Sequence, residues 1–78
     1  MGSLFPDDRY QVTLDDMIKA ADREVAMRIR VYPDWIRRGK ISEEFAAHQI
    51  ASMEAIAAFL RERREVGQIV QAIARRKL

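Results

Sequence analysis

The sequence predicts an all-α protein built as an antiparallel helical hairpin. Apolar residues recur at intervals of three and four over two long segments, and capping and acidic residues precede each segment. The charge also alternates along the chain in four blocks, which are acidic over 1–22, basic over 23–40, acidic over 41–60 and basic over 61–78. An antiparallel pairing sets acidic beside basic blocks at both ends, whereas a parallel pairing would set like charges together.

The chain begins with a segment that has no helical period. Residues 1–12 are predicted to form a flexible N-terminal tail, and residues 13–78 a single helical domain. The first residues lack the basic and apolar regions of a signal peptide. No apolar run approaches the roughly 18–20 residues that cross a membrane, so a cytoplasmic location without membrane contact is expected.

The first long helix is predicted over residues 14–31. Thr13 is a favourable N-cap, and the two aspartates in the first turn suit the positive end of the helix dipole. Pro33 disfavours the α conformation at Tyr32. The helix is therefore expected to end just before that residue.

The link to the second long helix is predicted to be a compact elbow. A short elbow helix is expected over 33–38, because proline suits a first helical position, with Gly39 capping it in the left-handed conformation. Ser42 is the next N-cap, and the second long helix is predicted over 43–65.

Gly67 is predicted to break or bend the second helix. Glycine inside a helix costs about 1 kcal/mol relative to alanine. A separate short C-terminal helix is therefore expected over 68–77. If the helix instead continues, Val70 and Ile73 would point about 80–90° away from the core face at Ile56–Leu60 and would serve another surface.

The first helix has more apolar surface than one partner helix covers. Its apolar arc spans about 200°, roughly twice what a surface helix needs. One stripe is Leu14, Ile18, Ala21, Val25, Ile29 and Tyr32. The second stripe, together with an acid–base pair inside the arc, is the predicted oligomer interface: Met17, Ala20, Glu24, Met27, Arg28 and Val31. Either a second subunit or the chain's own tail or C-terminal helix covers it.

Oligomerisation is the expected solution because the domain is small. A chain of 78 residues buries a marginal core, and with no cysteine it has no disulfide to support it. The pair of Glu24 and Arg28 has two interpretations. It reaches the edge of the interface, or it is half-buried and fixes the register of an oligomer or contacts a ligand.

The residues that catalysis or metal binding would need are scarce. There is no cysteine, His48 is the single histidine, and the three glycines form no phosphate-binding loop. Two of the three acidic pairs, Asp15-Asp16 and Glu43-Glu44, are explained by their places in helix first turns. We therefore expect no enzyme activity, no metal site and no cofactor.

The elbow concentrates cations and aromatic rings, and these residues form the predicted binding site: Arg28, Arg30, Tyr32, Trp35, Arg37, Arg38 and Lys40. Guanidinium groups beside stacking rings suit an anionic, base-bearing ligand. In the other interpretation, the rings close the open end of the hairpin and the cations remain solvated.

The segment Arg23–Trp35 resembles a group of small, uncharacterised helical proteins of tailed phages and prophages. Their pattern is close to R-E-(I/V)-x-M-R-x-R-V-Y-P, and this chain reads R-E-V-A-M-R-I-R-V-Y-P from Arg23. A Gly-Lys step and a second helix follow in both. The resemblance covers about residues 14–60 and implies a phage setting, in a host cytoplasm, without implying an activity.

Four hypotheses for function follow from that setting. The first is a non-catalytic accessory protein that binds a host protein through an exposed helical face, as an inhibitor or adaptor, including inhibition of a host defence. The second is an oligomer that sequesters a nucleotide-like anion at the elbow. Nucleic-acid binding is a third hypothesis, less favoured because the net charge is only +2. A structural part of the virion or its assembly is the fourth.

Overall fold

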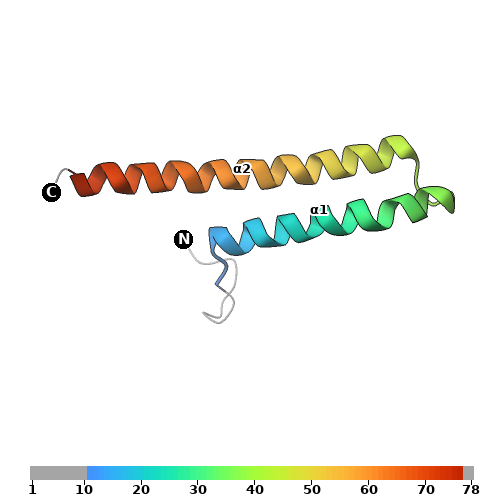
Figure 1. Ribbon diagram of the computed structural model, residues 1–78, viewed down its shortest axis with the longest axis horizontal. Helices are drawn as coiled ribbons and strands as arrows, with labels where there is room; N and C mark the ends of the chain where they lie inside the picture. Colours follow the sequence, from blue (N-terminus) through green and yellow to red (C-terminus); the bar gives the residue numbers. More distant parts are fainter. Residues whose placement is uncertain (1–10, 77–78) are drawn as a thin grey trace.

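The computed structural model describes residues 11–76 as two helices side by side. Helix α1 spans Leu14–Arg37 and helix α2 spans Glu43–Arg76. They run in opposite directions and are joined by a short turn at one end (Figure 1). The predicted all-α hairpin is confirmed. The tail predicted over 1–12 lies almost wholly outside the described residues.

Helix α1 begins with the cap that the sequence predicts. The backbone N–H of Asp16 donates to Oγ1 of Thr13 at 3.1 Å, and the backbone N–H of Thr13 donates to Oδ2 of Asp16 at 3.0 Å. This reciprocal pair is a capping box, which satisfies two backbone donors that the first turn leaves unpaired.

The separate elbow helix over 33–38 was a wrong prediction, because α1 continues through Pro33 to Arg37. Proline inside a helix costs about 3 kcal/mol, so packing must compensate. Tyr32, directly before the proline, is only 8% exposed, and its ring lies 5.4 Å from that of Trp35. Contacts on both sides of Pro33 thus hold the last turn in the helix.

The turn after α1 follows the predicted chemistry. Gly39 has a φ of +72°, the left-handed conformation that glycine adopts without strain. The N–H of Lys40 donates to the carbonyl of Trp35 at 2.9 Å, and that of Gly39 to Ile36 at 3.0 Å. These two bonds make a Schellman motif. Ser42 then caps α2, because its Oγ accepts from the N–H of Phe45 at 3.0 Å.

The predicted break at Gly67 is also wrong, and α2 is one helix of 34 residues that includes most of the predicted 68–77 segment. A cost of about 1 kcal/mol is too small to interrupt a long helix by itself. Arg64 already pairs with Asp15 in the first turn of α1. Residues 65–76 therefore extend past the N-terminal end of α1, and we call them the overhang (Figure 1).

The two helices meet along a hairpin seam whose members are buried or half-buried. On α1 these are Leu14, Ile18, Ala21, Val25, Arg28 and Tyr32, and on α2 Ala46, Ile50, Met53, Ala57 and Leu60. The steps of three and four residues give the 3.5-residue repeat of coiled coils. Buried alanines, such as Ala21 and Ala57, each 3% exposed, leave room for the backbones to approach closely.

One flank of the seam is charged. Arg61 of α2 pairs with Asp22, and Nη1 of Arg64 lies 3.1 Å from Oδ1 of Asp15. These pairs confirm that the basic part of α2 lies beside the acidic start of α1. At the other end, Glu43 and Glu44 take part in no ion pair within residues 11–76.

Candidate binding surfaces

The seven predicted elbow residues do not converge on one site. Arg28 and Tyr32 belong to the hairpin seam and face α2, whereas Arg30 is exposed. Residues 28 and 30 lie about 200° apart around a helix, so their guanidinium groups point to different sides. Lys40 is exposed in the turn.

Arg28 connects the two helices inside the chain. Its Nε lies 2.9 Å from Oε1 of Glu24, and its Nη1 donates to the backbone carbonyl of Gln49 in α2 at 2.7 Å. The Arg28 side chain is only 18% exposed. The geometry agrees with the interpretation in which the Glu24–Arg28 pair is half-buried. The pair fixes the register of α1 against α2 within the hairpin.

The aromatic residues of the elbow pack against each other. The rings of Tyr32 and Trp35 are tilted by 30°, with Tyr32 buried and Trp35 36% exposed. Arg37 and Arg38 both pair with Asp34, at 2.8 and 3.0 Å. With one ring buried and two cations paired to a carboxylate, the geometry favours the interpretation in which the rings close the hairpin.

Four exposed cations follow the outer side of α1. This basic face of α1 consists of Lys19, Arg23, Arg30 and Arg37. The three arginines are seven residues apart, so they form a row with steps of about 10 Å. Arg37 remains 76% exposed although it pairs with Asp34. Only Arg30 and Arg37 of this face were predicted as site residues, because the elbow residues are close together in the sequence, whereas the members of the row are spaced along the helix.

The predicted oligomer interface lies on the flank opposite the charged one. Apart from Arg28, which is itself in the seam, its residues stand one position before the seam residues of α1, whereas Asp15 and Asp22 stand one position after them. Met17 is 42% exposed, and Ala20 is exposed. Met27 and Val31 are half-buried. Glu24 pairs with Arg28, and Arg28 also donates to a backbone carbonyl of α2.

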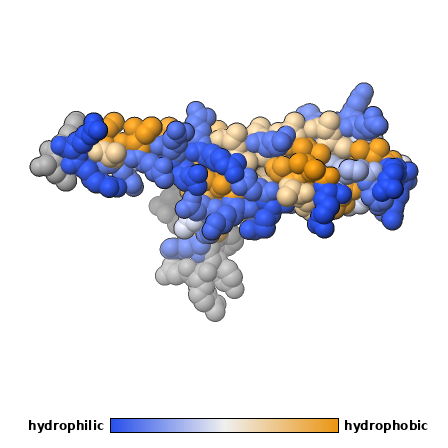
Figure 2. All heavy atoms as spheres, in the orientation of Figure 1, coloured by the Kyte–Doolittle hydropathy of each residue, from blue (hydrophilic) through white to orange (hydrophobic). Residues whose placement is uncertain are grey.

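A second apolar surface follows α2. It includes Val70 and Ile73, as expected for a helix that continues through Gly67, whereas its extension to Phe45, Ile56 and Phe59 was not predicted. This outer stripe of α2 has side chains 48–67% exposed: Phe45, Ile56, Phe59, Val66, Val70 and Ile73. The prediction that Ile56 and Phe59 lie in the core is wrong. Apolar surface is visible along α2 and again on the overhang (Figure 2). The signal was present in the sequence, because all six positions fit one heptad repeat that lies one residue before the seam.

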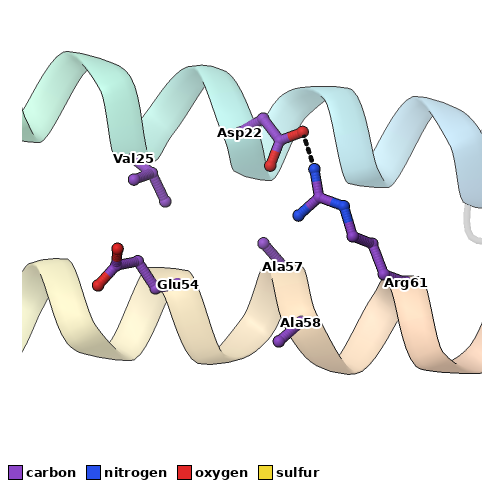
Figure 3. A pocket seen from close by; sticks show the side chains of 6 residues that line it. All are labelled: Asp22, Val25, Glu54, Ala57, Ala58 and Arg61. Atoms are coloured by element: carbon purple, nitrogen blue, oxygen red, sulfur yellow. Dashed lines mark hydrogen bonds and ion pairs between the residues drawn. The ribbon is translucent and has the colours of Figure 1, made fainter.

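Hollows between side chains lie in the hairpin and on the outer stripe of α2. In the hairpin, a hollow of about 330 Å³ is bordered on α2 by Glu54, Ala57, Ala58 and Arg61, and Val25 of α1 points toward it (Figure 3). These four positions are i, i+3, i+4 and i+7, the set that surrounds a hole in knobs-into-holes packing. Two more hollows of this type lie further along α2, bordered by Phe59, Glu62, Arg63 and Val66 and by Arg63, Val66, Gly67 and Val70.

Comparisons with known proteins leave these surfaces as the evidence for function. No family model matches the sequence, and searches among curated proteins and among solved structures return no similar chain. Within residues 11–76, neither helix combines the length and the hydropathy that crossing a membrane requires.

Proposed function

We propose that the protein is a non-catalytic accessory protein of the phage type that binds a host protein through the basic face of α1, as an inhibitor or adaptor. The observation that carries the proposal is the exposed row of Arg23, Arg30 and Arg37. The row lies on a helix that the hairpin seam holds in place, so the spacing of its cations is fixed. Binding a partner therefore does not require the helix to fold, which would cost free energy.

The spacing of the row favours a helical, acidic partner. Arginines repeat every seven residues, and acidic residues repeating every seven residues on a facing helix would meet each of them. Guanidinium groups bind carboxylates in a bidentate fashion, which favours a carboxylate-bearing surface. Met27 and Ala20 lie beside the row and supply apolar contact of an adaptable kind.

The same spacing disfavours a nucleic acid. Each strand of duplex DNA carries a phosphate about every 3.4 Å along the axis, whereas the row offers one guanidinium about every 10 Å. Asp22 and Asp34 also lie close to the row and weaken its positive potential. A nucleotide site is disfavoured because Tyr32 is buried and cannot stack on a base.

The test compares two double variants of the row. Arg23→Glu with Arg30→Glu reverses its charge, and Arg23→Lys with Arg30→Lys keeps it. Immobilised wild type and both variants are incubated with a bacterial lysate at low and high salt, and retained proteins are identified. We expect one protein with an acidic helical surface to be retained by the wild type and the lysine variant, lost with the glutamate variant, and released by salt.

Two parallel measurements separate the alternatives. Nucleotides are screened for a shift in melting temperature, and duplex DNA is tested for a mobility shift. If the wild type shows a nucleotide-dependent or DNA-dependent shift and the glutamate variant does not, the row binds that ligand and not a protein. Retention of the same lysate protein by the glutamate variant would move the site away from α1.

A further inference from the structure

The overhang of α2 has apolar side chains and no partner within the described chain. Every residue from 61 to 76 is exposed, including Val66, Ile69, Val70 and Ile73 at 50–59%. A helix segment of about 12 residues is marginal in water without tertiary contacts. The overhang continues the outer stripe of α2 and not the hairpin seam, whose later positions are Arg64, Gly67 and Gln71. Any helix that covers the overhang therefore approaches from the outer stripe.

The two hollows on this stripe are shaped for side chains of another helix. Each has the same four-residue outline as the hollow that Val25 borders within the hairpin. Gly67 forms one side of the second hollow, and nothing lies within 4 Å of the position that its Cβ would take. A neighbouring helix can therefore approach closely there.

We propose that the occupant is a second copy of this chain, whose α2 packs antiparallel against the outer stripe about a two-fold axis at Phe59. The stripe runs from Phe45 to Ile73, and Phe59 is its midpoint, so an antiparallel pair centred there overlaps over its whole length. Phe45 then lies opposite Ile73 of the second copy. The contact is isologous, as closed two-fold dimers require.

Matching side chains to hollows gives the same register. With Phe59 on the axis, Ile56 of the second copy lies over the hollow between Phe59 and Val66. Ser52 lies over the hollow beside Gly67, where a small side chain fits. The hydroxyl of Ser52 already donates to the carbonyl of His48 at 2.8 Å, so burying it leaves no unpaired donor.

Charge complementarity supports the antiparallel orientation. The first turn of α2 has Glu43 and Glu44, and its last turn has Arg75 and Arg76. The proposed register sets Glu43 of one copy opposite Arg75 of the other, at both ends of the dimer. Within the described residues, neither of these side chains has an ion-pair partner in the chain. A parallel pair would set like charges together.

The geometry around α2 also leaves room for a second helix. The outer stripe stands one residue before the seam, which is about 100° around the helix. Two partners at that angle occupy adjacent corners of a four-helix arrangement. The two-fold axis leaves both α1 helices on the same side of the α2 pair. Met17 and Ala20, on the flank that borders the outer stripe, then lie near the axis. Covering six half-exposed side chains on each copy buries on the order of 1,000 Å², near the lower end of stable interfaces.

Disulfide trapping tests the orientation, because the chain has no cysteine of its own. Phe59→Cys should form a covalent dimer on mild oxidation, since position 59 meets itself at the axis. Ile73→Cys alone should not, whereas a mixture of Ile73→Cys with a tagged Phe45→Cys should give the mixed dimer. Self-linking of Ile73→Cys would overturn the antiparallel orientation.

Light scattering tests the surface with two matched charge substitutions. The wild type should have twice the monomer mass of 9.1 kDa. Val70→Asp should be monomeric. The two helices of the hairpin should keep their helix content, because residue 70 is outside the hairpin seam. Gln71→Asp adds the same charge one residue away, off the stripe, and should remain dimeric. A monomeric wild type at every concentration, or a dimeric Val70→Asp, would overturn the proposal.

Gly67→Leu provides a variant that is not expected to unfold. Leucine is a better helix former than glycine, so the helix content should not fall. Its side chain fills the hollow that the second copy needs, and the dissociation constant of the dimer should rise at least about tenfold. An unchanged dissociation constant would contradict the proposed register.

Discussion

Arg28 occupies a seam position where hairpins usually place an apolar side chain. It is tolerated there because both ends of its polar group have partners, Glu24 on its own helix and the carbonyl of Gln49 on α2. A charged hydrogen-bond donor with partners is favourable, whereas one left without them is costly. The residue therefore specifies how the two helices align.

The first prediction follows from these two bonds. Arg28→Ala should lower the free energy of unfolding by about 1–3 kcal/mol, because hydrogen bonds of charged groups are lost and a gap is left in the seam. Arg30→Ala removes the same side chain from an exposed position and should change it by less than about 0.5 kcal/mol. Urea denaturation followed by circular dichroism measures both, and equal effects would show that Arg28 does not join the helices.

Asp16 makes the start of α1 sensitive to acid. The hydrogen bond from the backbone N–H of Thr13 lowers the pKa of Asp16 below its ordinary value of 3.8, and the Thr13 side chain and Lys19 act in the same direction. A carboxyl whose pKa is lower in the folded state stabilises it above the unfolded pKa, and this contribution disappears as the pH falls through the folded pKa.

The second prediction is a pH-dependent difference between wild type and Asp16→Asn. The wild type should melt at a higher temperature at pH 7, and the difference should shrink below about pH 4, where Asp16 becomes protonated. Thermal melts at a series of pH values, at constant ionic strength, measure it. A difference that stays constant down to pH 2 would show that the charge of Asp16 does not contribute.

Residue-by-residue burial could be predicted only in part from the sequence. A helical wheel with 3.6 residues per turn placed Ile29 in the seam stripe, but Ile29 is 52% exposed and Arg28 lies inside. The hairpin follows a 3.5-residue repeat, so over several turns the buried position shifts back by one residue. The wheel could not reveal this, because the pitch is set by the partner helix.

At the scale of helices, local chemistry predicted the ends better than the interiors. Thr13, Gly39 and Ser42 cap as expected, because capping depends on a few neighbouring residues. The continuity at Pro33 and Gly67 depends on contacts and on the sum of propensities along a whole helix. A helix-breaking residue lowers the stability of the helix by a limited amount, and packing contacts decide whether the helix forms despite it.

Pro33→Ala is the third prediction, and it separates the two descriptions of the elbow. In a continuous α1 the alanine restores a backbone donor and removes a clash, so the free energy of unfolding should rise, by up to about 3 kcal/mol. If Pro33 instead began a separate helix, it would sit at a favourable first position and its loss would be neutral or destabilising. Urea denaturation distinguishes these outcomes, with exposed Ala26→Gly as a control that should destabilise by about 1 kcal/mol.

For the whole molecule, stability is expected to depend on protein concentration. A hairpin with few buried side chains has a small core, and the proposed dimer adds to it by mass action. The fourth prediction is that the melting temperature of the wild type rises over a hundredfold range of concentration, while that of Val70→Asp stays constant. Scanning calorimetry at several concentrations measures it, and parallel behaviour of the two proteins would count against self-association.

A dimer would also present two basic faces on one particle. Two tethered sites bind a partner that has two matching sites far more tightly than either does alone. The sequence predicted a non-monomer from the excess of apolar surface on α1. It did not predict that the longer unpartnered surface belongs to α2, because the extent of the overhang depends on where α1 ends against it.

The position of the turn at Gly39 governs how the hairpin opens. Contacts between the helices join residues 21 positions apart at Arg28 and Gln49, 39 apart at Asp22 and Arg61, and 49 apart at Asp15 and Arg64. Closing a longer loop costs more entropy, so pairs near the turn form first and those far from it separate first. In the monomeric Val70→Asp variant, amide hydrogen exchange should therefore be slowest near the turn and become faster toward Leu14. The helices of the monomer separate first at the N-terminal end of α1 and last at the Schellman turn.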